Sequence, residues 1–175
     1  DSIADCLASV LDQDYPKHSY EVVVVDDGSD DHTAQIVESL AKKNPRLKLL
    51  LLPSDGNETG GRKPKAISMA IKETKGDIIL TTDADCVVPA GWIRGMVSHF
   101  EKSIALVAGP VVDREEGNLV ARLARLEFLG LITTAAGLIG SGKPMICNGA
   151  NLAYRRSAFI AAGGFGGDDR FSDDE

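Results

Sequence analysis

The sequence predicts an α/β domain with a mostly parallel β-sheet covered by helices on both faces. Three observations carry this prediction. Short aliphatic runs alternate along the 175-residue chain with longer segments of helical periodicity. Two of the short runs, residues 22–25 and 78–80, are apolar at every position, as expected of strands buried on both faces. Acidic residues follow both runs, at the carboxyl ends of strands where α/β sheets bind ligands.

Length and composition agree with a single folded domain over residues 1–175. The chain is 43% hydrophobic and 26% charged, which is ordinary for a globular protein. Its formal net charge of −7 argues against a nucleic-acid partner, because such proteins present basic faces to phosphates. A nucleotide ligand is not excluded, since a bound divalent ion and a local basic cluster reverse the charge of one site.

The three cysteines do not suggest a zinc site or a disulfide framework. Cys6, Cys86 and Cys147 are odd in number, far apart in sequence and form no Cys-x-x-Cys pair. We therefore expect reduced thiols.

The first half of the chain alternates helices and strands. Apolar residues at helical spacing predict a helix over 2–13, and the valine run predicts a strand over 22–25. Gly28 allows a sharp turn into a helix over 33–43, and a second strand follows over 47–52.

The second half continues the alternation. We expect a helix from Pro64 to Gly76, a strand from Ile78, a helix from Pro89, a strand over 104–112, a helix over 119–139, a strand or loop over 145–151 and a short helix over 156–162. The helix over 119–139 is either a core helix or one that contacts a membrane surface, and we favour the core. The longest apolar run, 126–140, is too short to span a bilayer.

Asp83 and Asp85 follow the strand that begins at Ile78, one residue apart. Two carboxylates there suit a Mg²⁺ or Mn²⁺ ion, which in turn holds phosphate oxygens. The alternative is a solvated acidic turn.

A basic cluster follows the glycine-rich loop 53–61. Arg62, Lys63 and Lys65 are the densest group of positive charges in the chain, at the predicted start of a helix. Fixed positive charge of this kind suits a phosphate group, and the alternative for each residue is a solvated surface charge.

Six motifs in order resemble the inverting family 2 glycosyltransferases of the GT-A, Rossmann-like fold. They are Asp-Asp-Gly-Ser at 26–29, Gly-Arg-Lys-Pro-Lys-Ala-Ile at 61–67, Thr-Asp-Ala-Asp at 82–85, Gly-Ala-Asn-Leu-Ala-Tyr-Arg-Arg at 149–156, Gly-Gly-Phe at 163–165 and Asp-Asp at 173–174. Members of this family usually begin with a further strand and continue into an acceptor-side helix. The resemblance thus implies a catalytic domain truncated at both ends.

The resemblance implies a role for each motif in binding the nucleotide donor. Asp27 is expected to form a hydrogen bond with the nucleotide base, with Asp26 as its structural neighbour. A carboxylate suits the ring N–H of uracil because it only accepts hydrogen bonds. Lys63, with Arg62 and Lys65 near it, would approach the diphosphate.

The other motifs supply the metal, the base and the acceptor side. Asp83 resembles the residue that contacts the ribose, and Asp85 the metal ligand of a DXD motif. Asp174 corresponds to the general base, with Asp173 as the alternative if the register shifts by one. Gly149 and Asn151 would line the acceptor side.

These assignments imply a glycosyltransferase of the hexosyltransferase type. It would move a sugar from a UDP-sugar to a hydroxyl of a glycan, lipid or protein by a single displacement assisted by Mg²⁺ or Mn²⁺. The alternatives are a nucleotidyltransferase and a non-catalytic nucleotide-binding module. The resemblance also suggests a cytoplasmic location, at the inner face of the plasma membrane through regions outside this chain.

Overall fold

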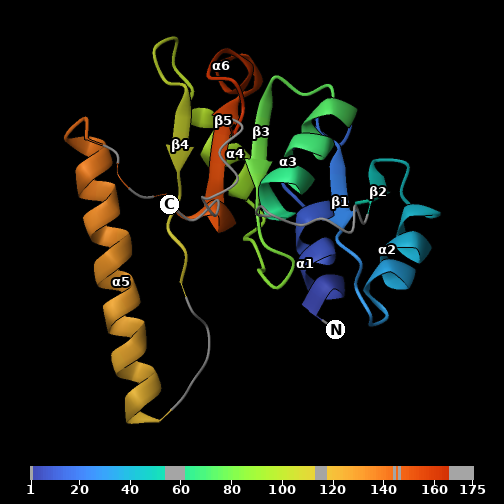
Figure 1. Cartoon of the computed structure of the whole chain (residues 1–175), viewed down its shortest axis with the longest axis horizontal. Helices are drawn as coiled ribbons and strands as arrows, with labels where there is room; N and C mark the ends of the chain where they lie inside the picture. The colour runs from blue at the N-terminus through green and yellow to red at the C-terminus, as the bar shows by residue number, and fades with distance from the viewer. Residues whose placement is uncertain (1, 54–61, 113–117, 144, 146, 166–175) are drawn as a thin grey trace.

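The computed structural model describes residues 2–53, 62–112, 118–143, 145 and 147–165 (Figure 1). The elements in chain order are α1 (Ser2–Leu11), β1 (Val22–Asp26), α2 (Thr33–Ala41), β2 (Leu47–Leu51), α3 (Arg62–Glu73), β3 (Ile78–Thr81), α4 (Trp92–Ser98), β4 (Leu106–Ala108), α5 (Leu119–Gly140), the 3-10 turn η1 (Gly149–Asn151), β5 (Leu152–Arg155) and α6 (Arg156–Ala161). The α/β class is confirmed, and most predicted elements lie within a few residues of their expected bounds.

The described strands form two hydrogen-bonded groups. β1 and β2 pair in parallel, with Val22 opposite Leu47. In the other group β5 lies between β3 and β4 and runs antiparallel to both, so β3 and β4 point the same way. The sheet was expected to be mostly parallel, and β5 is the reversed strand; it begins at Leu152 rather than within 145–151.

Helix α3 shows that β1 and β3 also run in the same direction. Near the end of the helix, the backbone N–H of Lys75 donates to Glu21, just before β1, and β3 starts a few residues later. At the start of the helix, Arg62 contacts Asp27 and Lys63 contacts Asp83, just after the two strands. The carboxyl ends of β1 and β3 thus meet at the start of α3.

Helix α1 occupies the centre of the core. Its residues Cys6 and Val10 belong to a cluster with α4 and β5, while Ile3 and Leu7 pack against α2 and β2 in a second cluster. Burying an aliphatic side chain of this size contributes about 1.5–3 kcal/mol. The apolar stripe of α1, which the sequence predicted, therefore joins the two hydrophobic clusters.

Helix α5 contradicts the expectation of a core helix. None of its 22 residues is buried, and Figure 1 shows it standing apart from the rest of the molecule. Judged by length and composition alone, α5 is also long and apolar enough to cross a membrane. The expectation from sequence considered only the shorter run 126–140. Helical periodicity identified the helix, but a periodic pattern does not say what covers it.

Candidate active site

The candidate site is built where β1 and β3 end. The guanidinium of Arg62 forms an ion pair with the Asp27 carboxylate, and its Nη2 also donates to the Asp27 carbonyl at 3.3 Å. The ammonium of Lys63 lies 3.0 Å from Oδ1 of Asp83. Two consecutive residues of α3 therefore hold the acidic ends of two strands that are 56 residues apart in sequence.

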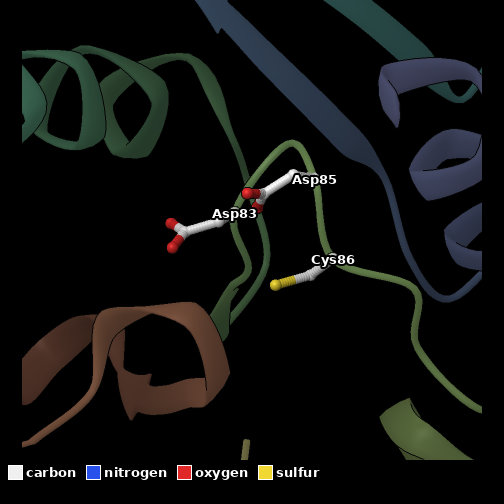
Figure 2. Close-up of side chains that lie close together, drawn as sticks. All are labelled: Asp83, Asp85 and Cys86. Atoms are coloured by element: carbon white, nitrogen blue, oxygen red, sulfur yellow. The ribbon is translucent and has the colours of Figure 1, made fainter. Parts of the chain in front are cut away.

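The turn after β3 gathers three possible ligand atoms. The ligand atoms of Asp83, Asp85 and Cys86 all lie within 4.8 Å of one another, and Figure 2 shows the three side chains extending to the same side of the turn. The turn is closed by the Cys86 backbone N–H, which donates to the Asp83 carbonyl at 3.1 Å. The spacing Asp-x-Asp therefore places both carboxylates on one side.

The donor set fits a hard divalent cation. Asp83 and Asp85 offer carboxylate oxygens, which Mg²⁺ and Mn²⁺ prefer, and Asp85 is exposed, so further positions are open to water or phosphate oxygens. Burial, and then the charges of Asp85 and Asp83, raise the pKa of the Cys86 thiol. A hard cation prefers the carboxylate oxygens to sulfur, so Asp83 and Asp85 are the candidate ligands of this group.

A second thiol lies directly beneath the acidic turn. Sγ of Cys6, in α1, is 3.5 Å from the carbonyl oxygen of Asp83. Burial first, and then Cys86, Asp85 and Asp83, raise the pKa of Cys6 to about 11. Sequence reasoning missed this contact, although the position of Cys6 on the apolar stripe of α1 was a signal that the residue is buried.

Asp26 and Asp27 are adjacent but have different surroundings. Asp26 is buried, and its carboxylate accepts hydrogen bonds from the backbone N–H groups of Gly28 and Ser29 and from the Ser29 hydroxyl. Gly28 has φ of +78°, which an L-residue rarely adopts. Asp26 therefore shapes the turn, and Asp27 presents its partly exposed carboxylate to α3.

A cavity of about 700 Å³ lies between β1 and β3. Its walls are mostly aliphatic side chains and backbone of the two strands, together with residues of α1 and α3. Asp27, Lys63, Thr82 and Asp83 lie among its lining residues, so the polar groups of the site border this cavity. Gly149 lines it as well, and its carbonyl accepts a 2.7 Å hydrogen bond from the Thr81 hydroxyl.

Asn151 is engaged within the fold. Its Oδ1 accepts from the indole N–H of Trp92 at 2.8 Å, and its Nδ2 donates to the Pro110 carbonyl at 2.8 Å. In this structure the amide joins α4 to the segment after β4. Trp92 itself is buried in the core.

Of the predicted site residues, Lys65 and the two candidates for the general base remain. Lys65 is exposed, two residues after Lys63 and therefore on another side of α3. Asp173 and Asp174, the candidates for the general base, lie outside the described residues. The roles assigned to all of these side chains from sequence stay predictions.

The fold and the site together define a class of protein. An α/β sheet with acidic groups at its strand ends and basic groups facing them is the arrangement of a domain that binds a nucleotide or another phosphorylated ligand. Within that class, the chain belongs to glycosyl transferase family 2, whose family model matches residues 1–163.

Individual relatives agree with this family. The chain is 32% identical over 163 residues to an N-acetylglucosaminyltransferase of Rhizobium meliloti, covering 91% of this chain and 37% of the relative. It is 32% identical over 141 residues to the beta-monoglucosyldiacylglycerol synthase of Synechocystis, covering 74% of this chain and 29% of the relative. The chain thus spans about a third of the length of these relatives.

Solved structures show the same GT-A fold. The mannosyltransferase PcManGT from Pyrobaculum calidifontis, solved in complex with GDP-Man and Mn²⁺, superposes with a TM-score of 0.69 at 27% identity, covering 95% of this chain and 44% of that one. S. aureus TarS 1-349, solved in complex with UDP-GlcNAc, gives a TM-score of 0.60 at 22% identity, covering 92% and 43%. The second likeness concerns the fold alone.

Proposed function

We propose that this chain is the donor-binding part of an inverting glycosyltransferase that transfers a sugar from a nucleotide diphosphate, with UDP-sugar as the donor, to an acceptor hydroxyl. The observation that carries the proposal is the meeting of Asp27, Asp83 and Asp85 with Arg62 and Lys63 at the ends of two strands. Family membership supports sugar transfer over the alternative of nucleotidyl transfer.

Each side chain then has a separate task. Asp27 accepts a hydrogen bond from the base, and Asp83 accepts from the ribose hydroxyls. Lys63 lies beside Asp83 and offsets the negative charge that grows on the diphosphate as the bond to the sugar breaks.

Asp85, with Asp83 beside it, would hold Mg²⁺ or Mn²⁺. When bound, such an ion neutralises the leaving diphosphate as a Lewis acid. The structure with GDP-Man and Mn²⁺ supports a divalent ion in this fold. Asp85 is the assigned ligand because it is the more exposed of the two carboxylates and Asp83 already has Lys63 as its partner.

The general base is assigned to Asp174, with Asp173 as the alternative. A single displacement needs one carboxylate opposite the diphosphate, which takes the acceptor proton as the hydroxyl attacks the sugar carbon. In the protein carrying this chain, Asp174→Asn should lower turnover by about 10²–10⁴-fold while leaving UDP affinity unchanged. Wild-type turnover in that variant would move the base elsewhere, with Asp173→Asn as the next measurement.

The nucleotide base is tested by competition. A carboxylate also accepts from the ring N–H of guanine, and relatives of this fold have been solved with both UDP-GlcNAc and GDP-Man. Calorimetry with UDP, GDP and ADP should give UDP the highest affinity, and Asp27→Asn should reduce that preference. Tighter binding of GDP would contradict the assignment of UDP.

The acceptor is proposed as a glycan, lipid or protein hydroxyl, approached from the side of Gly149. We place the reaction in the cytoplasm, at the inner face of the plasma membrane. Relatives named for N-acetylglucosaminyl transfer and for diacylglycerol glycolipid synthesis support acceptors of more than one kind. Fractionation of cells into cytosol and membranes tests the location.

A further inference from the structure

The acidic turn belongs to a connection without helix or strand. β3 ends at Thr81 and α4 begins at Trp92, so Asp83 and Asp85 lie within the connection 82–91. A connection of this kind keeps one shape only where other groups hydrogen-bond to its backbone. The groups that hold it therefore decide where the two carboxylates lie.

Two residues of α1 and one residue just after it contact this connection. Cys6, Ser9 and Gln13 are three and four residues apart, which is the spacing of one helix face. Sγ of Cys6 lies 3.5 Å from the carbonyl oxygen of Asp83, near the start of the connection. We call Cys6, Ser9 and Gln13 the polar row of α1.

The Ser9 hydroxyl makes two hydrogen bonds with different roles. It donates to the Cys6 carbonyl of its own helix at 2.7 Å, and it accepts from the backbone N–H of Val88 at 3.1 Å. A hydroxyl has one donor and two lone pairs, so the first bond orients the oxygen and leaves a lone pair for Val88. Ser9 thus fixes the connection just after the acidic turn.

Gln13 holds the end of the connection and the start of α4. Its side chain is buried, with the residue 5% exposed. Nε2 donates to the carbonyls of Ser9 and Pro89, both at 2.9 Å, and Oε1 accepts from the backbone N–H of Ile93 at 3.0 Å. The N-cap residue of α4, Gly91, makes no side-chain cap. Gln13 therefore supplies from α1 a bond that the first turn of α4 requires.

The polar row holds the connection on both sides of Asp85. It contacts the chain at Asp83 through a thiol and at Val88 through a hydroxyl. Asp85 lies between these two points and its side chain is exposed, so the position of its carboxylate depends on how the flanking backbone is held. Groups behind the ligands of a metal ion commonly set the metal affinity in this way.

We propose that Ser9 and Gln13 are positioning residues, which hold the connection 82–91 so that Asp83 and Asp85 share one divalent cation. Their hydrogen bonds go to backbone groups, so they act through the shape of the connection. This inference rests on the proposed function, because it assigns the groups behind the metal ligands. The same bonds also contribute to folding, so its test has to separate positioning from stability.

The metal-dependent part of UDP binding provides that separation. Gln13→Met keeps the length of the side chain and removes its hydrogen bonds. In the protein carrying this chain, calorimetry should show UDP affinity with Mn²⁺ lowered about tenfold, and UDP affinity without Mn²⁺ within about twofold of wild type. Ser9→Ala should act in the same direction. Ser9→Thr, which keeps the hydroxyl, should retain the wild-type affinity with Mn²⁺.

Val37→Ala is the matched control for stability. Val37 is fully buried in the other hydrophobic cluster, with Ile3, Leu7 and Leu47, away from the acidic turn. Its truncation leaves a cavity and should lower the melting temperature. The gain in UDP affinity from Mn²⁺ should stay at the wild-type value.

Amide hydrogen exchange without ligand separates this inference from the proposed function. The Cys86 N–H closes the acidic turn by donating to the Asp83 carbonyl. Its exchange, relative to that of Ala153 in the central strand β5, should be about tenfold faster in Ser9→Ala and Gln13→Met than in wild type. In Val37→Ala this ratio should not change.

The two measurements give clear contradicting outcomes. Wild-type exchange of the Cys86 amide in both variants overturns the proposal, as does faster exchange with an unchanged gain from Mn²⁺. A loss of that gain in Val37→Ala as large as in Gln13→Met also overturns it, since stability alone then explains the effect. If wild type gains nothing from Mn²⁺, the metal assignment of the proposed function fails, and the exchange rates still decide whether the polar row holds the turn.

Discussion

Lys63 and Asp83 form the central contact between the basic and acidic parts of the candidate site. Their charged atoms are 3.0 Å apart and both side chains are about 40% exposed, so the pair is solvated and contributes little to stability. Its value is positional, because Lys63 keeps a positive charge beside the turn that carries Asp85. A bound diphosphate would share that charge with Asp83.

Replacing Lys63 by Gln should weaken UDP binding about tenfold, since one charge-assisted hydrogen bond to the diphosphate is lost. The melting temperature should change little. Calorimetry measures the affinity, and Lys72→Gln, an exposed lysine in the same helix, is the control. Equal affinities of wild type and Lys63→Gln would remove Lys63 from the donor site.

At the scale of elements, α3 aligns the two strands that form the site. Its start contacts Asp27 and Asp83, and just beyond its end Glu21 accepts from the Lys75 N–H at 2.7 Å and from the Lys48 ammonium at 3.0 Å. Partial burial of Glu21 opposes its ionisation, but these two hydrogen bonds outweigh it and lower the pKa of Glu21 below its ordinary value.

This carboxylate predicts a pH-dependent contribution to stability. A lowered pKa in the folded chain stabilises it above the ordinary pKa of 4.5, and the contribution is lost as the pH falls through the folded value. Glu21→Gln should therefore lower the free energy of unfolding at pH 7 by up to about 1 kcal/mol, and the difference from wild type should shrink below pH 4.5.

Urea denaturation at about four pH values between pH 3 and pH 7 measures this difference in the free energy of unfolding. Glu38→Gln, which removes an exposed pair with Lys42 on α2, is the control and should change stability less. A difference between wild type and Glu21→Gln that stays constant with pH would show that the ionised carboxylate does not stabilise the fold.

Local sequence patterns predicted where helices and strands form better than they predicted which elements pack or pair with one another. The apolar run at 22–25 and the stripe of α1 fixed where strands and core helices form, because burial on both faces or one face leaves a direct mark in the sequence. Strand direction leaves none, so the reversed pairing of β5 was not predicted. A helical pattern likewise does not say what covers a helix, so the exposure of α5 was not predicted.

The candidate site was predicted in part. The acidic residues at the ends of β1 and β3 were expected to lie together, because parallel strands place their carboxyl ends at one edge. The pairing of Arg62 with Asp27, and the placement of Cys6 beneath Asp83, depend on how distant elements pack and leave no local pattern. The same holds for the use of Asn151 inside the fold.

At the scale of the whole molecule, the cavity between β1 and β3 lies between two strand edges with which a further strand can pair. Among the described residues, β1 pairs only with β2 and β3 only with β5, so each strand presents a free edge to the cavity. In β1, Val22 donates to Arg46 and Asp26 accepts from Leu52, both beside β2. Backbone groups alternate between edges, so the N–H groups of Val23 and Val25 face the cavity.

The free edge predicts a pattern of hydrogen exchange. In the 175-residue chain, the amides of Val23 and Val25 should exchange much faster than that of Val24, which faces β2. If a longer chain carries the further strand that the family resemblance implies, pairing with that strand should slow the exchange of both amides to the rate of Val24. Fast exchange of Val23 in such a chain would show that the cavity holds no strand.

The central claim is that the acidic turn after β3 binds a metal-bound nucleotide diphosphate, and calorimetry of UDP binding with and without Mn²⁺ tests it most directly. Wild type should bind UDP at least about tenfold more tightly with Mn²⁺, and Asp85→Ala should abolish that gain. Asp77→Ala, at the opposite end of β3, should keep it. An unchanged Mn²⁺-dependent affinity in Asp85→Ala would contradict the account.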